Sequence, residues 1–112
     1  MSEYIQIQWT CKDEEEAKKI SRLLIENRYV ACANILPRVE SIFSWKGRIE
    51  SAQESKVLLK TLSSNFEAIK EIINENSSYD VPEIISFPIE HGNEEYLNWM
   101  KESCSPPKET KL

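Results

Sequence analysis

Residues 30–61, VACANILPRVESIFSWKGRIESAQESKVLLKT, contain the pattern that decides the fold. Apolar residues of one parity recur along the first half, as in a strand with one buried face: Ala31, Ala33, Ile35, Val39, Phe43 and Trp45. Gly47 lies where a hairpin turn needs a positive φ. The second half is clearest at residues 56–61, KVLLKT. We therefore predict two long antiparallel strands that are joined at residues 45–48.

This hairpin is too long for the domain that carries it. At ~3.3 Å per residue, a strand over residues 30–45 would reach roughly 50 Å, whereas a domain of this size has a radius of gyration of about 13 Å. The hairpin should therefore project as an arm and carry Phe43, Trp45 and Ile49 beyond the local core. Exposed apolar edges need a partner, so we predict an oligomerisation arm. Pro37 cannot donate to the strand ladder, which predicts a bulge at residues 37–38.

Composition limits the class of protein. A chain of 112 residues predicts one domain, over residues 1–104, followed by a polar, disordered tail at residues 105–112. The net charge of −5 without a basic block argues against a nucleic-acid partner. No apolar run approaches the ~20 residues of a membrane span. The three cysteines are odd in number and irregularly spaced, which predicts a reduced, cytoplasmic protein.

The remaining elements complete the fold. In order along the chain, they are a strand over residues 4–10, a helix capped by Asp13, a helix capped by Ser64, a strand over residues 82–89 and a short C-terminal helix capped by Asn93. With the hairpin, the order is that of the α+β, ferredoxin-like split βαβ fold, in which both helices cover one face of an antiparallel sheet. Three copies that turn their other faces inward would cover the remaining face, as in a trimer.

Five short motifs, read in order, resemble the CutA divalent-cation tolerance family. They are ACANI at 31–35, SIFSWKG at 41–47, LKT at 59–61, YDVPEI at 79–84 and YLNW at 96–99. The resemblance spans about residues 5–100. It implies a ferredoxin-like fold, a tight homotrimer and a link to copper and other divalent ions. One position departs from the family: Ser77 and Ser78 stand where it usually has His-Pro, so a histidine sometimes proposed as a metal ligand is missing.

Three side chains are candidate metal ligands: Cys32, Cys11 and His91. Copper favours thiolates, but the commonest role of a free cysteine is that of a small buried apolar residue. None of the three has another Cys or His at ligand spacing nearby, and His91 can equally be an ordinary loop residue. No cofactor is therefore required, and copper or another divalent ion is expected to bind weakly.

Charged and aromatic side chains allow two interpretations. The charged residues at or near strand ends are Glu54, Lys60, Glu83 and Glu90, which could form inter-subunit ion pairs or line a ligand cleft. Trp45, Tyr79 and Trp99 could stack on a ligand or lie at a subunit interface. For the trimer interface we predict Phe43, Trp45, Ile49 and Trp99.

Catalytic motifs are not found in the sequence. It has no Gly-x-Ser-x-Gly elbow, no phosphate-binding glycine loop and a single histidine, so we predict a protein that is not an enzyme. The principal hypothesis is a homotrimer for divalent-cation tolerance, whose partners are its own copies and divalent metal ions. An alternative is a trimeric small-molecule sensor similar to PII signalling proteins, for which Lys46 and Arg48 provide few basic groups. An acylphosphatase-like hydrolase ranks last, because residues 10–13 contain no arginine for an anion-binding loop.

Overall fold

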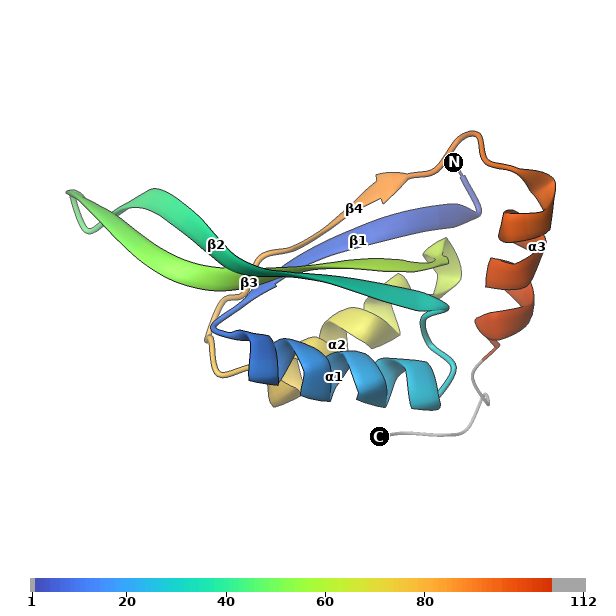
Figure 1. Ribbon diagram of the computed structural model, residues 1–112, viewed down its shortest axis with the longest axis horizontal. Helices are drawn as coiled ribbons and strands as arrows, with labels where there is room; N and C mark the ends of the chain where they lie inside the picture. Colours follow the sequence, from blue (N-terminus) through green and yellow to red (C-terminus); the bar gives the residue numbers. More distant parts are fainter. Residues whose placement is uncertain (1, 106–112) are drawn as a thin grey trace.

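The computed structural model describes residues 2–105 and shows one four-stranded antiparallel sheet in the order β2-β3-β1-β4 (Figure 1). Along the chain the elements are β1 (Tyr4–Cys11), α1 (Glu14–Glu26), β2 (Cys32–Trp45), β3 (Arg48–Leu62), a short 3-10 turn η1 (Ser63–Asn65), α2 (Phe66–Asn76), β4 (Ile84–Pro88) and α3 (Glu94–Ser103). The predicted α+β fold and order of elements are confirmed. Most of the predicted tail, residues 106–112, lies outside the described residues.

Helices α1 and α2 lie on one face of the sheet, and α3 lies at the end of the sheet opposite the hairpin tip (Figure 1). The core fills the space between the sheet and the first two helices. Its largest fully buried side chains include Trp9, Ile7 and Leu59 from the strands and Leu24 and Ile69 from the helices. No helix in residues 2–105 is long and apolar enough to cross a membrane.

The helix starts agree with the sequence in part. Asp13 caps α1 as predicted, since its Oδ1 accepts a hydrogen bond of 2.9 Å from the Glu16 N–H. The prediction that Ser64 caps α2 is wrong, because η1 precedes the helix and Asn65 is its N-cap. The buried Asn65 side chain donates to the carbonyl oxygen of Tyr29 instead. It therefore anchors the α1–β2 connection rather than the helix end. Asn93 occupies the N-cap of α3 without a side-chain cap bond.

A bulge in β2 determines which side of the sheet each part of the hairpin faces. Leu36 lies opposite Lys56, but Val39 lies opposite Glu54, so β2 contains one residue more than β3 over this interval. Arg38 takes up the extra length with a φ of 55°. The bulge predicted at residues 37–38 is confirmed.

The prediction that the alternating apolar residues of β2 share one face is wrong beyond the bulge. Before it, Ala33 pairs with Leu59, which belongs to the core beneath the helices. After it, Phe43 pairs with Glu50 and Trp45 with Arg48, which are even-numbered residues of β3 and point to the opposite face. Ile35 therefore packs on the core, whereas Val39, Phe43 and Trp45 face away from the helices.

The hairpin projects from the body as an arm, which we define as residues 39–54 (Figure 1). Lys46 and Gly47 form its two-residue turn with φ angles of 51° and 77°, as a type I′ turn requires. The molecule extends 44 Å along its longest axis. Trp45 is 60% exposed and Ile49 is 84% exposed, so the predicted protrusion is confirmed.

The open face of the sheet, opposite α1 and α2, also exposes apolar side chains. Ile85 pairs with Gln8 and Phe87 with Gln6, which lie on this face, and both are more than two-fifths exposed. Leu36, which pairs with Lys56 on this face, is exposed to a similar degree, as is Trp99 on α3. This chain alone leaves that face uncovered.

Replacing Gly47 by alanine should lower the free energy of unfolding by about 1–2 kcal/mol, because an L side chain at a left-handed φ is strained. A Cβ there would meet no atom within 4 Å, so the cost comes from the backbone. Urea unfolding at a fixed protein concentration measures the change, with Ser44→Ala in the same arm as control. An unchanged midpoint would mean that the turn rearranges freely and does not hold the two strands together.

Candidate functional site

A groove of about 640 Å³ lies on the open face of the sheet, between the base of the arm and the loop that leads into β4. Its walls come from three parts of the chain: the end of β1, the arm strands β2 and β3, and residues 79–83. The bulge places the groove, since it turns Phe43 and Trp45 toward this side. We call this feature the arm groove.

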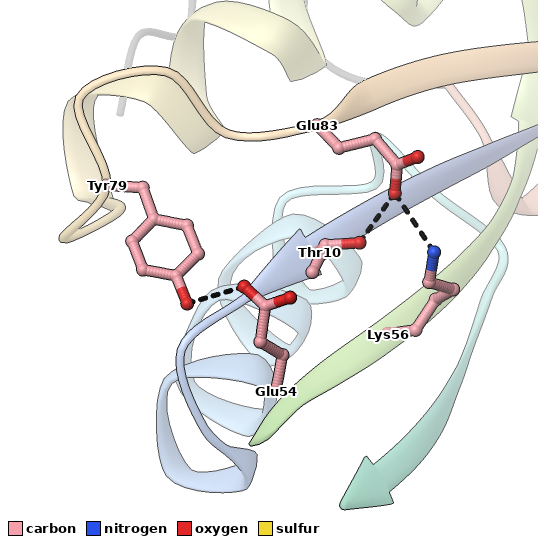
Figure 2. A network of polar contacts seen from close by, with 5 residues as sticks. All are labelled: Thr10, Glu54, Lys56, Tyr79 and Glu83. Atoms are coloured by element: carbon pink, nitrogen blue, oxygen red, sulfur yellow. Dashed lines mark hydrogen bonds and ion pairs between the residues drawn. The ribbon is translucent and has the colours of Figure 1, made fainter. Parts of the chain in front are cut away.

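Glu83 joins these parts of the chain (Figure 2). Its Oε1 accepts a hydrogen bond of 2.5 Å from Thr10 Oγ1 and lies 3.1 Å from the ammonium of Lys56. Thr10 and Lys56 are themselves direct partners across β1 and β3. The Thr10 N–H also donates to the Glu83 carbonyl oxygen at 3.2 Å. One residue thereby fixes the loop to two neighbouring strands.

The charge of Glu83 is stabilised in the folded chain. Partial burial would raise the pKa of its carboxyl group, but hydrogen bonds from Thr10 and Lys56, together with the Lys56 charge, outweigh this effect and hold the pKa below the ordinary glutamate value. Glu83 and Lys56 therefore form an ion pair at neutral pH. The Lys56 charge is largely compensated within the groove.

Tyr79 and Glu54 form the second contact in the groove (Figure 2). The Tyr79 hydroxyl donates to Glu54 Oε2 at 2.7 Å. Partial burial, this hydrogen bond and the carboxylate charge raise the pKa of Tyr79 above that of an ordinary tyrosine. The hydroxyl therefore stays protonated and holds the Glu54 carboxylate in place at the base of the arm.

The three predicted metal ligands lie far apart. Cys11 is opposite Ser55 and Cys32 is opposite Lys60, so five residues of β3, or about 17 Å, separate them along the sheet. His91 follows β4 near the start of β1, at the other end of that strand from Cys11. Among residues 2–105, no three His, Cys, Asp or Glu side chains converge to hold a metal ion.

The cysteines differ in their surroundings. Cys11 and Cys104 are buried, and Cys32 is half-buried with its Sγ 3.8 Å from Asn34 Oδ1. Burial first, and then the nearby Glu16 carboxylate, raise the pKa of Cys11 to about 12. The thiolate is the form that binds metals, so Cys11 is held in the form that does not. The ammonium of Lys60 also bonds the Asn34 side chain, next to Cys32.

The structure brings some of the predicted ligand-cleft residues together and separates others. Glu54, Glu83, Trp45 and Tyr79 all line the arm groove. Trp99 instead lies on α3, with its ring centroid 5.3 Å from that of Tyr96. Glu90 lines a different cavity near the start of β1. Lys60 lies six residues along β3 from Glu54, toward the end of the strand that is away from the arm.

Sequence reasoning missed Thr10 and Lys56 as members of this site. Lys56 shares a face of β3 with Glu54, which alternation along the strand could have indicated. The pairing of Thr10 with Lys56 depends on the register of β1 against β3. That register is set by long-range packing, so no local signal identifies the pair.

Comparison with known proteins places this arrangement in a family. The family model described as CutA1 divalent ion tolerance protein matches residues 5–103. The chain belongs to this family. The predicted family resemblance is thereby confirmed.

Individual CutA relatives agree closely with the chain. The divalent-cation tolerance protein CutA of Thermus thermophilus is 42% identical over 94 residues, which cover 84% of this chain and 91% of that protein. Protein CutA of Mus musculus is 42% identical over 81% of this chain and 51% of its own length. The chain spans about half the length of several such relatives, including the chloroplastic CutA of Arabidopsis thaliana.

Solved CutA structures share the fold. The structure of CutA1 from Oryza sativa has a TM-score of 0.90 at 35% identity and covers 93% of this chain and 95% of its own. The periplasmic divalent cation tolerance protein CutA from Archaeoglobus fulgidus has a TM-score of 0.88 at 36% identity, with 91% and 99% covered. The architecture in Figure 1 is therefore that of CutA proteins.

Replacing Glu83 by glutamine should lower the free energy of unfolding at neutral pH by less than about 1 kcal/mol, because its ion pair is partly exposed and screened by solvent. The folded chain has the lower pKa for this group. The stability that the Glu83 carboxylate contributes is therefore fully present above its pKa in the unfolded chain. This stability is lost as the pH falls through its pKa in the folded chain.

Wild type and Glu83→Gln should differ in stability at pH 7 and converge as the pH falls below the ordinary glutamate pKa and through the lower pKa of the folded chain. Thermal unfolding across this range, at one protein concentration, measures the difference. Glu67→Gln is the control, since it removes a carboxylate from the exposed Lys70–Glu67 pair on α2. A difference between wild type and Glu83→Gln that grew on acidification would contradict the assigned direction of the pKa shift.

Proposed function

We propose that this chain acts as a non-enzymatic homotrimer in the tolerance of divalent cations. The observation that supports assembly most is the set of exposed apolar side chains on the arm, on the open face and on α3. It comprises Leu36, Ile42, Phe43, Trp45, Ile49, Ile85, Phe87 and Trp99. Apolar surface of this extent is typical of interaction sites, and β2 and β4 each have one unpaired edge in a single chain.

A trimer suits the position of these residues. Three copies that turn their open faces toward a common axis would bury the sheet surface, while each arm would reach along its neighbour. Phe43, Trp45, Ile49 and Trp99 would then lie at subunit interfaces. We retain the cytoplasm as the proposed location, although the printed names of relatives include both a periplasmic and a chloroplastic protein.

For divalent ions, we propose weak binding through surface groups and no required metal cofactor. Glu54 and Glu83 supply carboxylates in the arm groove, and Cys32 supplies the one thiol that is only half-buried. The core consists of apolar side chains packed between sheet and helices, so the chain is expected to fold without metal, unlike a structural zinc domain.

The arm groove favours a second candidate function, that of a small-molecule sensor. Its volume of about 640 Å³ lies within the range of ligand pockets, roughly 300–1,000 Å³. Aromatic and charged side chains line it together, which is typical of sites for organic ligands. A sensor of this kind could use the same trimer.

Replacing Trp45 by aspartate should dissociate the trimer, because it places a charge where apolar surface is expected to be buried between subunits. The cost should be several kcal/mol, or more than about a hundredfold in the dissociation constant. Light scattering of wild type and variant measures the mass. Ile25→Asp, at an exposed site on α1, is the matched control and should remain trimeric. A wild-type monomer with native circular dichroism would refute the proposal.

Calorimetric titration of copper and zinc into the reduced protein tests the metal proposal. Binding should be micromolar or weaker, because the candidate ligands do not converge. It should be indifferent to Cys32→Ser and reduced by Glu54→Gln, whereas Glu90→Gln outside the groove should leave it unchanged. Nanomolar binding that Cys32→Ser abolishes would instead make this thiol a true ligand.

A further inference from the structure

Helix α3 is attached to the body of the molecule through a small contact of its own. Met100 is fully buried, and Cys104, at the end of the helix, is nearly so. Neither belongs to the core cluster between the sheet and the first two helices. The exposed side of α3 carries the paired rings of Tyr96 and Trp99. An element with few buried apolar contacts opens locally at a low free energy, so polar contacts have a large share in holding α3 in place.

One such contact comes from the end of α1, next to the end of α3 (Figure 1). The Arg28 guanidinium donates from Nη2 to the Glu102 carbonyl oxygen at 2.6 Å and from Nε to the Ser105 carbonyl oxygen at 3.3 Å. The last four carbonyl groups of a helix, here including that of Glu102, have no partner within it. A cation at this end also interacts favourably with the helix dipole. We call this pair of bonds the Arg28 clamp.

The backbone of Arg28 has a conformation that favours glycine, with a φ of 63°. The Arg28 N–H donates to the Ile25 carbonyl oxygen at 3.0 Å. The Tyr29 N–H donates to the Leu24 carbonyl oxygen at 2.9 Å. These two bonds form the Schellman pattern that ends a helix, in which glycine is the usual residue at the left-handed position. Arginine takes this position against its backbone preference, and the clamp on α3 offsets the strain.

We infer that Arg28 is a positioning residue for the subunit interface: it fixes α3 against the end of α1 and so holds Trp99 where a neighbouring subunit would meet it. The inference rests on the homotrimer proposed above and specifies how part of its interface is held. Arg28 follows α1, on the face of the sheet that points away from the proposed interface. It would therefore act on assembly through α3 and not by direct contact with a neighbour.

The Cys104 thiol reports on the position of α3, because it is 3% exposed and becomes accessible when the helix opens. The test compares wild type with Arg28→Gly, in which the backbone turn is relaxed and the guanidinium is lost. Iodoacetamide should label Cys104 about tenfold faster in Arg28→Gly, since two hydrogen bonds from a charged group are lost. Mass spectrometry of the digested protein measures the rate. The labelling rate of Cys11, in the core, should not change, which excludes global unfolding.

Two control variants separate the guanidinium from its charge. Arg28→Lys keeps the charge but lacks the planar fork that bonds two carbonyl groups, so its labelling rate should lie between those of wild type and Arg28→Gly. Arg22→Gln removes a charge from the exposed side of α1 and should leave the rate unchanged. Loss of the Arg28 charge alone would slow the reaction of Cys104, because burial raises the pKa of this thiol and the charge offsets part of that rise.

Subunit exchange tests the link to assembly. Wild-type trimers with and without 15N label are mixed, native mass spectrometry follows the mixed species, and the same is done for Arg28→Gly. Exchange should be about tenfold faster in the variant, because the open form, in which Trp99 has left the interface, is about ten times more populated. An unchanged labelling rate of Cys104 would overturn the inference. So would faster labelling with an unchanged exchange rate.

The same native mass spectra separate this inference from the trimer. A wild-type trimer in which Arg28→Gly is labelled like wild type overturns the inference alone. A wild-type monomer refutes the proposed assembly, and faster labelling of Cys104 in its Arg28→Gly variant would still support the role of Arg28 in fixing α3.

Discussion

One extra residue in β2, accommodated at Arg38, determines which side chains of the arm lie on each face of the sheet. Strand side chains alternate, so an inserted residue exchanges the two faces of everything that follows. Before the bulge, Ala33 and Ile35 complete the core under the helices. After it, Phe43 and Trp45 face the open side, where Glu54 and Lys56 also lie. Without the bulge, these aromatic rings would lie on the helix side of the sheet and the arm groove would lose one wall.

The groove also depends on an anchor at its opposite wall. The loop between α2 and β4 contains no helix or strand of its own, and Glu83 ties it to both β1 and β3 through Thr10 and Lys56. Tyr79 then reaches Glu54 from this fixed loop. Hydrogen bonds that involve an ionised partner are stronger than neutral ones. The polar network therefore holds in position a wall that packing alone leaves exposed.

The sequence predicted the fold well, since periodicity, turn chemistry and family motifs all indicated the same order of elements. It located the bulge from Pro37 but not its consequence, because alternation was extended across residues 37–38 as though the strand were regular. The Ser64 cap failed for a different reason: tertiary contacts bury Asn65 and direct its side chain to Tyr29. The sequence identified four candidates that do line the groove: Glu54, Glu83, Trp45 and Tyr79. That they meet there with Thr10 and Lys56 depends on the pairing register of the strands.

The arm groove and the proposed interface share Phe43 and Trp45, which has a thermodynamic consequence. If both functions hold, a ligand in the groove and a neighbour on the arm act on the same aromatic surface, so each must change the affinity of the other by the same factor. A neighbour that closes the groove over the ligand makes this coupling positive, and one that occupies the ring faces makes it negative. In either case the response to a ligand would appear as a change in subunit affinity. The arm is then the element through which this small chain can convert the binding of a ligand into a change of assembly.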